Sequence, residues 1–523
     1  MTDFLFRGSL AELDPEVQEL SQIEAERQAR KLILIASESS APLAVRQAMA
    51  SAFQNIYAEG YPDEETRWMK EEQILDYPER LAHFRRYSDL RYYKGTEYAD
   101  IVEALARRRC AELFAANGIS ADSIYVNVQA LSGAPANNAV YHALVNPGET
   151  MMGMDLIHGG HLTHGSPVNR SGKFYNAVHY TVDPVTEKID YEAVEDLAKQ
   201  HKPKFIIAGY SAYPWSVDWA RLRAIADGAG AYLFADIAHV AGLVAAGVYP
   251  SPVGYAHVIT FTTHKSLCGP RGACILTTDA SLARKIDKAV FPGEQGGPHV
   301  QIFAAMALAF KLAKTESFRQ LQTQVVKNSV ALSNRLQEQG WRIAFGGTDT
   351  HLVNLDCSVH RGVEDASLSG DQAARILDIA GIVVNRNTIP GDKSAADPSG
   401  VRMGTVWVTQ RGFKEPQMVQ VADLIDQVLK ATTPFHLEGR KGEARRAKVD
   451  FDALEEVRLK VRTLAEQAGH DEDLPHHSYP HFYYLDDYAG RTGSVSFLLQ
   501  SERVREFANF AFSSNVEALN PGE

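Results

Sequence analysis

The stretch Val258-Ile-Thr-Phe-Thr-Thr-His-Lys-Ser-Leu-Cys-Gly-Pro-Arg-Gly272 decides the fold. An apolar, β-branched run ends just before Lys265 and is followed by a Gly-Pro turn, a pattern typical of a buried strand with an amine at its carboxyl end. Open α/β sheets bind their ligands at that edge. An amine among apolar and hydroxyl neighbours loses its proton readily enough to form a Schiff base. For this residue alone, a strand-end lysine that faces solvent is the alternative.

Other apolar runs extend this strand into a sheet. Between residues 97 and 320 they alternate with helical segments, which predicts a mostly parallel sheet with right-handed crossovers. The predicted strands lie at 123–128, 150–154, 205–208, 232–236, 258–261 and 273–277. A helical pattern at 301–339 then leads to strands near 341–356 and 382–408, which predict a second, smaller α/β domain.

The order of elements predicts four regions. These are an N-terminal helical arm at 1–56, a large domain at 57–320, a small C-terminal α/β domain at 321–434 and a C-terminal extension at 435–523. An insertion at about 63–90 interrupts the large domain. It is rich in charges of both signs and in aromatic residues, which favours a helical excursion. We interpret it as a surface decoration in preference to a lid or a regulatory element.

The composition limits the class of protein. The 523 residues carry a net charge of −12 and no basic stripe interleaved with aromatic residues, which argues against a nucleic-acid partner. Four scattered cysteines fit neither a disulfide framework nor a zinc site. The first ten residues lack a signal-peptide pattern, and the most apolar stretch, at 231–250, is too short and interrupted to span a membrane. We expect a soluble protein of the cytoplasm.

A turn with small residues follows the first predicted strand. Ser132 and Gly133 precede a helical pattern that ends near Asn146-Pro147-Gly148. Such a turn presents backbone N–H groups and the positive end of the helix dipole to an anion, most naturally a phosphate. The alternative is that Ser132 only caps the helix.

Two further motifs lie at other predicted strand ends. Asp236 ends the run at 232–236, where a buried acid needs a cationic partner such as a protonated pyridine nitrogen. The alternative is an Asp that caps the next helix. Residues 156–165 contain three histidines around two adjacent glycines, which favours a tight loop with one imidazole stacked on a ligand. We predict no metal there, because no carboxylate lies nearby at ligand spacing.

Together these features resemble serine hydroxymethyltransferase, a family of pyridoxal-phosphate enzymes with the aspartate-aminotransferase fold (fold type I). The resemblance covers about residues 12–434. The strings that carry it are Leu34-Ile-Ala-Ser-Glu38, Tyr57-Ala-Glu-Gly-Tyr-Pro62, Arg91-Tyr-Tyr93, His158-Gly-Gly-His161 with Ser166-Pro-Val-Asn169, the stretch 236–250, Thr262-Thr-His-Lys265 and Arg402-Met-Gly-Thr405. It implies reversible transfer of the serine hydroxymethyl group to tetrahydrofolate, the cosubstrate, in a homodimer or tetramer with shared active sites.

The resemblance also implies roles for single residues. Lys265 would carry pyridoxal 5'-phosphate, Asp236 would bind its ring nitrogen and Glu59 would be the acid/base. His264 and Tyr92 would be further catalytic positions. The other implied cofactor contacts are Ser132, Gly133, His161, His239 and Ser211, with Tyr57, Gly296 and Gly297 from a partner subunit. The implied substrate contacts are Ser37, Arg402 and Arg271, and the implied folate contacts are Leu156, Gly160, Leu162 and Asn387.

The chain departs from the family pattern in several places. Ala134 stands where the family has a second serine in its phosphate turn, and Glu294 adds a charge to Phe291-Pro-Gly-Glu-Gln-Gly-Gly297. In the extension, apolar positions at 451–464 share one helical face, which favours packing, and His470, His476, His477 and His481 offer a weak metal alternative. Two other functions stay open: a folate-independent β-hydroxyamino-acid aldolase of the threonine type, and a non-catalytic scaffold with the same fold.

Overall fold

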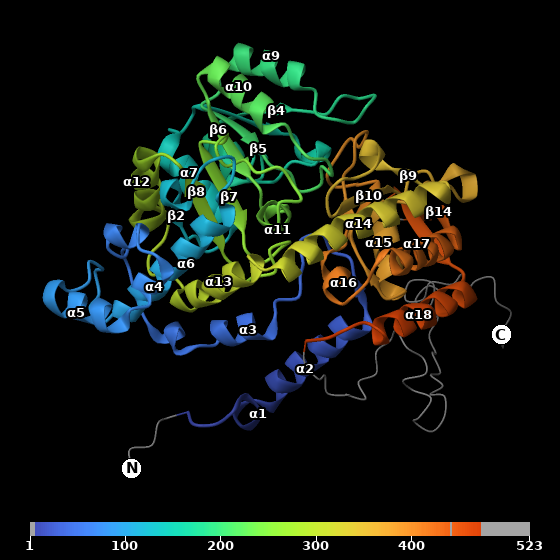
Figure 1. Ribbon diagram of the computed structural model, residues 1–523. Helices are drawn as coiled ribbons and strands as arrows, with labels where there is room; N and C mark the ends of the chain where they lie inside the picture. The colour runs from blue at the N-terminus through green and yellow to red at the C-terminus, as the bar shows by residue number, and fades with distance from the viewer. Residues whose placement is uncertain (1–5, 440–441, 472–523) are drawn as a thin grey trace.

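The computed structural model describes residues 6–439 and 442–471. The largest two cores of apolar side chains belong to two different sheets, a further core covers the other face of the larger sheet, and the long helix α14 (Glu316–Glu338) contributes to the largest two. Phe318 and Val325 of this helix lie in the first core, and Leu332 and Leu336 lie in the second. Figure 1 shows α14 running from the larger sheet layer toward the smaller one.

In the described part of the chain, the larger sheet has seven strands in the order β2-β8-β7-β6-β5-β3-β4. The strands are β2 (Tyr125–Asn127), β3 (Thr150–Met154), β4 (Asn176–Tyr180), β5 (Phe205–Ala208), β6 (Tyr232–Asp236), β7 (Val258–Thr262) and β8 (Ala273–Thr277). The pairs from β3 to β7 are parallel, and β8 is antiparallel to both of its neighbours. The predicted mostly parallel sheet is therefore confirmed.

Burial on both faces explains which strands the sequence predicted. Every residue of β5, β7 and β8 is buried, so these strands read as continuous apolar or β-branched runs. The strand β4 was not predicted from the sequence, because this edge strand is only partly covered and carries Asn176 and His179. The sheet is flanked by the helices α6 (Glu97–Phe114), α7 (Gly133–Leu144), α9 (Tyr191–His201), α10 (Trp219–Ala229), α11 (Ala241–Ala245), α12 (Ala280–Lys288) and α13 (Val300–Ala313).

The smaller sheet is antiparallel and has the order β12-β13-β10-β9. Its strands are β9 (Arg342–Ile343), β10 (Leu352–Asp356), β12 (Asn385–Asn387) and β13 (Gly400–Gly404), and the helices beside it are α15 (Gly370–Ile379), α16 (Val406–Gln410) and α17 (Glu415–Lys430). Strands occur in both segments where the sequence predicted them. The single helical pattern predicted at 301–339 is instead two helices, because Thr315 caps α14 by accepting a hydrogen bond from the Phe318 N–H.

The N-terminal segment is not purely helical as predicted. Besides α1 (Leu10–Leu13), α2 (Pro15–Arg30) and α3 (Leu43–Met49), it contains the strand β1 (Leu32–Ile33), which pairs in parallel with β11 (Ile382–Val383). Leu32 and Leu34 belong to the second core. Two residues are too short a run to show a strand period, and their pairing partner lies 350 residues away. The four-region division remains a proposal.

The insertion at about 63–90 is helical. It contains a 3₁₀ turn (Glu64–Arg67), α4 (Glu71–Ile74) and α5 (Tyr77–Tyr87). Ile74 and Phe84 pack with Ile101 and Ala104 of α6 in a small core of their own. Figure 1 shows α4 and α5 at the edge of the molecule, beside α6.

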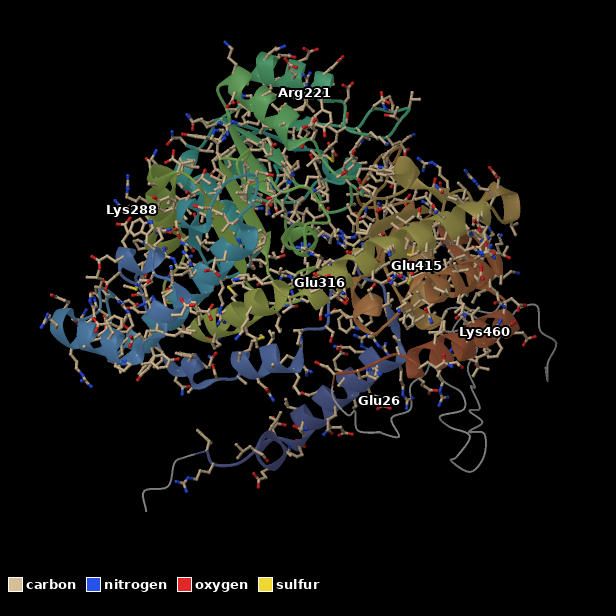
Figure 2. The ribbon with its side chains drawn as sticks, in the orientation of Figure 1. Glu26, Arg221, Lys288, Glu316, Glu415 and Lys460 are labelled. Atoms are coloured by element: carbon tan, nitrogen blue, oxygen red, sulfur yellow. The ribbon has the colours of Figure 1, made fainter. Side chains whose placement is uncertain are left out.

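The first part of the C-terminal extension completes the second core. A hairpin of β14 (Thr432–Gly439) and β15 (Gly442–Val449) leads into α18 (Phe451–Glu466). As the apolar pattern predicted, one face of α18 is buried, with Leu454, Val457 and Val461 in the core. Phe451 was expected on that face but is half exposed, because it is the first helical residue. Figure 2 shows the opposite face, where Lys460 points outward.

One guanidinium joins the two ends of the described chain. Arg411, which follows α16, donates to the carbonyls of Ala29 (2.8 Å) and Lys31 (3.1 Å) near the end of α2, and to the carbonyl of Ala465 (2.6 Å) in α18. The predicted histidine positions 476, 477 and 481 lie outside the described residues. Among the described helices, none combines the length and the apolar character that a membrane crossing requires.

Candidate active site

A cavity of about 190 Å³ opens at the carboxyl edge of the large sheet. Its walls come from the segments that follow β2, β3, β5, β6 and β7, so strands far apart in sequence deliver side chains to one place. Seven predicted site residues line it: Gly133, His161, Ser211, Asp236, His239, His264 and Lys265. Ala134, His164, Tyr210, Ala238 and Thr262 complete the lining.

Lys265 lies in the turn that follows β7. The turn is held by two backbone hydrogen bonds, from the Cys268 N–H to the Lys265 carbonyl (3.0 Å) and from the Gly269 N–H to the Thr263 carbonyl (2.7 Å). Burial lowers the pKa of Lys265 to about 8, the charge of Asp236 opposes this, and Arg402 and Arg271 lower it further. A substantial fraction of the amine is therefore neutral near pH 8 and able to act as a nucleophile.

Asp236 ends β6 and is held by groups that the sequence analysis did not assign. Its Oδ2 accepts a hydrogen bond from Asn137 Nδ2 (2.8 Å) and lies 3.1 Å from His164 Nε2. Burial alone would raise the pKa of Asp236, but His164, His161 and Asn137 outweigh it and lower the pKa below its usual range. Asp236 does not cap the next helix, because α11 begins after Val240. It stays ionised and can face a cation.

Three histidines of the cavity, His161, His239 and His264, are neutral bases. Burial lowers the pKa of His161 to about 4, and burial with the charges of Lys265 and Arg271 lowers the pKa of His264 to about 4. Burial also lowers the pKa of His239 well below its ordinary value. Among the described residues, Nδ1 of His164, of His239 and of His264 has no hydrogen-bond partner. Unsatisfied buried nitrogens at a cavity wall indicate a site that receives a polar ligand.

The first turn of α7 forms another wall. Ser132 is the N-cap residue, but its hydroxyl makes no capping hydrogen bond, so it is free for another acceptor or donor. A Cβ at Gly133 would lie 2.9 Å from Cγ2 of Thr262, so glycine allows the helix to begin this close to β7. The N–H groups of this turn are available to an anion.

Arg402 comes from β13 of the smaller sheet and reaches the large one. Its Nη1 donates to the Ser211 carbonyl (2.6 Å), and its Nε donates to Asn385 Oδ1 (3.2 Å). Ser211 in turn donates from Oγ to the Gly160 carbonyl (2.6 Å). Burial lowers the pKa of Arg402 to about 10, which leaves it cationic at neutral pH. A planar cation at this position suits a carboxylate.

The remaining predicted substrate and folate residues lie around the contact between Arg402 and Ser211, where the smaller sheet reaches the larger one. The Leu156 carbonyl accepts from Thr388 Oγ1 (3.3 Å), which brings the histidine loop beside Asn387 of β12. Leu162 is 43% exposed, so it offers apolar surface outside the cavity. Ser37 follows β1, and Arg271 is exposed but close enough to influence the pKa of Lys265.

Five predicted residues form a separate group on the surface. Tyr57 OH lies 3.4 Å from Glu59 Oε1, and the Tyr92 N–H donates to the Glu59 carbonyl (2.9 Å). The Tyr57 ring covers Gly297, where a Cβ would come within 2.7 Å of it, and a Cβ at Gly296 would lie 3.0 Å from Glu59 Oε1. None of these five described residues lines the cavity with Lys265. Within one chain, the predicted acid/base and the predicted amine are therefore not brought together.

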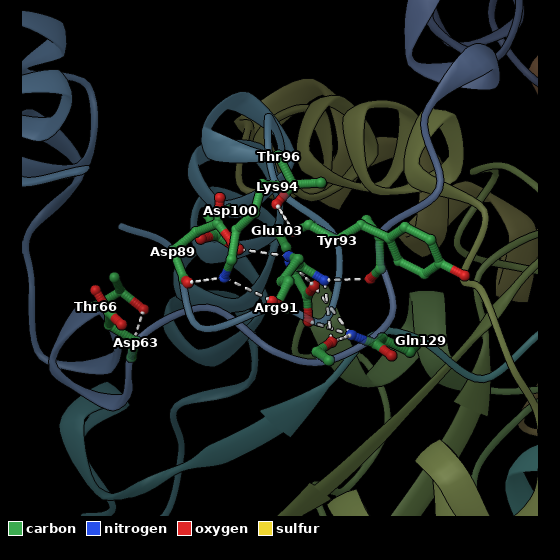
Figure 3. A network of polar contacts seen from close by, with 12 residues as sticks. Asp63, Thr66, Asp89, Arg91, Tyr93, Lys94, Thr96, Asp100, Glu103 and Gln129 are labelled. Atoms are coloured by element: carbon green, nitrogen blue, oxygen red, sulfur yellow. Dashed lines mark hydrogen bonds and ion pairs between the residues drawn. The ribbon is translucent and has the colours of Figure 1, made fainter. Parts of the chain in front are cut away.

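A buried ion network holds the Glu59 loop from behind (Figure 3). Arg91 is 1% exposed and donates to the carbonyls of Ala58 (2.8 Å) and Gly60 (3.0 Å), one on each side of Glu59. The same guanidinium pairs with Asp100 and Glu103 of α6, both at 2.5 Å. In the sequence, Arg91 stands out only as part of the string Arg91-Tyr-Tyr93. A buried arginine can be recognised by acids at helical spacing downstream, which Asp100 and Glu103 supply.

Two departures from the family pattern can now be located. Ala134 lines the cavity beside Gly133, where a serine hydroxyl would face the ligand. Glu294 pairs with Arg170 Nη1 (2.6 Å) and lies 2.9 Å from His142 Nδ1, so its charge is matched within the chain.

The cavity contains the one potential metal group found among the described residues. Ligand atoms of His161, His164 and Asp236 lie within 4.8 Å of one another. The carboxylate that the histidine loop lacks in sequence is thus supplied in space by β6. Its Oδ2 already accepts a hydrogen bond from Asn137 Nδ2 and lies 3.1 Å from His164 Nε2, so groups of the chain itself engage this oxygen.

These groups fit pyridoxal phosphate. Lys265 offers the amine for its aldehyde, Asp236 an anion for its ring nitrogen, His161 a neutral flat face, and the first turn of α7 a cradle for its phosphate. The serine hydroxymethyltransferase family model matches residues 10–88 and 83–425, and the two ranges meet within the insertion. This match confirms the predicted fold type I and does not favour the aldolase or scaffold alternatives. The chain thus belongs to the serine hydroxymethyltransferase family, enzymes that use pyridoxal phosphate to transfer the hydroxymethyl group of serine to tetrahydrofolate and leave glycine.

Proposed function

We propose that Lys265, Asp236, Arg402 and Glu59 perform the reaction of the family in this chain. The observation that carries the proposal is the cavity in which a strand-end amine shares a wall with an ionised aspartate that is held by His164 and Asn137. When bound, pyridoxal phosphate supplies an electron sink for the bond that breaks at Cα of the amino acid.

The residues of the cavity bind and orient the cofactor. Lys265 binds the cofactor through its amine, and Asp236 holds a proton at the ring nitrogen, because an anion there favours the charged form of the ring. His161 covers one face of the ring and stays neutral, which follows from its lowered pKa. Ser132 and Gly133 bind the phosphate through hydroxyl and backbone donors.

Arg402 binds the carboxylate of the amino acid. In the resting arrangement its guanidinium donates to the Ser211 carbonyl and to Asn385 Oδ1, so it is oriented before substrate arrives. Ser37 and Arg271 complete the substrate pocket, Tyr92 joins it from the partner subunit together with Glu59, and His239 and His264 flank the reacting end. Leu156, Gly160, Leu162 and Asn387 bind the folate.

Glu59 is the acid/base that moves a proton at the hydroxyl of serine. It lies outside the Lys265 cavity of its own chain, with the exposed rings of Tyr57 and Tyr92 beside it. We therefore propose a homodimer, or a tetramer built from such dimers, in which Tyr57, Glu59, Gly296 and Gly297 of one subunit complete the site of the other. Apolar exposed rings next to functional polar groups support such a contact.

We propose the cytoplasm as the compartment and predict neither a nucleic-acid nor a membrane partner. The four cysteines are buried and unpaired, as expected in a reducing environment. The net charge of −12 supports the prediction that the chain has no nucleic-acid partner.

The test is complementation between two inactive variants. Lys265→Ala lacks the amine, and Glu59→Gln lacks the acid/base. If sites are shared, mixing the two after subunit exchange restores about a quarter of the wild-type rate, because half of the dimers are mixed and each has one intact site. The control mixes Lys265→Ala with the double variant, which contains no intact site. Exchange without recovered activity contradicts the shared site.

A further inference from the structure

A second cavity, of about 150 Å³, lies between the insertion, α6, β2 and α12. We call it the insertion pocket and define it by Tyr61, Glu64, Arg67, Arg107, Arg284 and Asp287. It shares no lining residue with the Lys265 cavity. Glu64 and Arg67 are the two ends of the 3₁₀ turn of the insertion, so this segment supplies part of the pocket wall.

Arg67 is a buried cation without adequate acceptors. Its side chain is 10% exposed, and its Nε and Nη1 have no hydrogen-bond partner among the described residues. The nearest carboxylate oxygen, Oδ2 of Asp287, is 3.9 Å from Nη2, beyond hydrogen-bond range. The guanidinium stacks on the Tyr125 ring, with Cζ 4.4 Å from its centroid. Stacking orients the fork but does not replace acceptors, and buried unsatisfied donors are costly.

The charges around Arg67 also favour an anionic ligand, because cations outnumber effective anions there. Arg107 is buried beside it and Arg284 lies exposed at the rim, so three guanidinium groups face the pocket. Burial and the neighbouring charge of Arg107 lower the pKa of Arg67 to about 10. Of the two carboxylates, Glu64 is exposed, and Asp287 Oδ1 already accepts from Asn127 Nδ2 (2.8 Å). Burial also raises the pKa of Asp287, which weakens it as a counter-ion.

We propose that the insertion pocket binds a phosphate-type oxyanion, either free inorganic phosphate or the phosphoryl end of a small phosphomonoester. A tetrahedral oxyanion supplies several acceptors at once to the Nε and Nη atoms of Arg67 and to the neighbouring guanidinium groups. A cavity of about 150 Å³ admits one phosphoryl group but not a nucleotide. The proposal is independent of the roles assigned to Lys265 and Glu59, because it uses none of their contacts.

The experiment titrates inorganic phosphate into the holoenzyme, in which the cofactor phosphate site is filled, at constant ionic strength maintained with chloride. Calorimetry measures the dissociation constant, and the thermal midpoint is followed in parallel. We expect saturable binding that raises the midpoint. Arg67→Gln is expected to weaken binding by about tenfold or more, since it removes charge-assisted hydrogen bonds. Glu64→Gln is expected to tighten it, because an anion leaves the rim.

Two further variants keep the test decisive. Arg284→Gln removes an exposed rim charge, so it folds even if Arg67→Gln does not, and is expected to weaken binding less. Arg319→Gln removes an equally positive side chain from α14, 66% exposed and outside the pocket, and is expected to have no effect. The proposal is overturned if phosphate shows no saturable binding, or if the pocket variants bind like Arg319→Gln. Glycerol phosphate in place of inorganic phosphate separates the two sources, since tighter binding of the ester assigns the pocket to a phosphorylated metabolite.

Discussion

The Lys265 cavity and the Glu59 loop are built in opposite ways. The cavity is assembled by a parallel sheet, whose strand ends bring buried residues from five segments to one edge. The Glu59 loop lies at the surface between exposed tyrosines and is positioned from behind by the buried guanidinium of Arg91. The fold itself therefore positions the residues of the cavity, whereas a few buried charges position Glu59, the proposed acid/base.

This difference sets how each region should respond to substitution. A cavity residue can be replaced without altering the sheet that carries the others. Removing one partner of a buried ion pair costs about 3–5 kcal/mol, because the remaining charges stay buried. Damage behind the Glu59 loop should therefore reach Glu59 while leaving the Lys265 cavity intact.

The largest effect is expected from Glu59→Gln, which should lower turnover without changing cofactor binding. A positioned acid/base contributes roughly 10²–10⁴ in rate, so folate-dependent turnover should fall by about that factor. Cofactor absorbance should stay at the wild-type level, since Glu59 does not line the cavity. Glu79→Gln on the exposed side of α5 serves as the charge control. Wild-type turnover in Glu59→Gln would identify Glu59 as an ordinary surface charge.

Arg91→Lys tests the positioning of the loop. Lysine keeps the charge but cannot reach both carbonyls and both acids, so we expect kcat to fall by up to about 10²-fold through misplacement of Glu59. Cofactor content should not change. Arg109→Lys is the matched control, because Arg109 of α6 pairs with Glu71 of α4 and donates to the Ala307 carbonyl, away from the loop. If both variants lose kcat equally, general destabilisation explains the result.

Ala134→Ser restores the hydroxyl of the family pattern in the cavity. A hydrogen bond to a charged group contributes about 1.5–3 kcal/mol, so the dissociation constant for pyridoxal phosphate should fall by about tenfold or more. Equilibrium dialysis of the cofactor measures this. Ala143→Ser, near the other end of α7, is the control. An unchanged dissociation constant would mean that the α7 cradle is already satisfied.

The smallest effect is a shift in pH dependence. Because the pKa of Lys265 is lowered to about 8, capture of cofactor by the apoenzyme should accelerate as pH rises through about 8, where the amine becomes neutral. Asp236→Asn removes the anion that raises this pKa, so the inflection should move to lower pH. Stopped-flow absorbance follows the capture. An inflection near 10.5, the ordinary lysine value, would contradict the burial argument.

The same contrast explains what the sequence could predict. Strands buried on both faces are continuous apolar runs, so β3 and β5 were predicted with their observed ends. The residues at or shortly after the ends of such runs, including Asp236 and Lys265, were predicted with them. The edge strand β4 and the two-residue β1 were not predicted, because neither carries an apolar run long enough to be recognised as a strand.

The partners of site residues were harder to predict than the residues themselves. Asn137 and His164 act on Asp236 across 99 and 72 positions, a pairing that only the folded sheet creates. The network of Arg91 likewise depends on α6 packing beneath the Glu59 loop, with Gln129 donating to the Gly60 carbonyl from another segment. Side-chain chemistry and spacing indicate which residues react, but not which residues hold them.

Because Arg411 contacts both α2 and α18, a change at one end of the described chain is expected to affect the other end. The family match stops at residue 425, yet the guanidinium that anchors α2 also anchors α18, and α18 covers apolar surface of the second core. Trimming the chain at residue 425 would remove Leu454, Val457 and Val461, uncover the apolar surface that they pack against, and take away the α18 side of the Arg411 contacts. The first part of the C-terminal extension therefore helps to anchor both ends of the described chain.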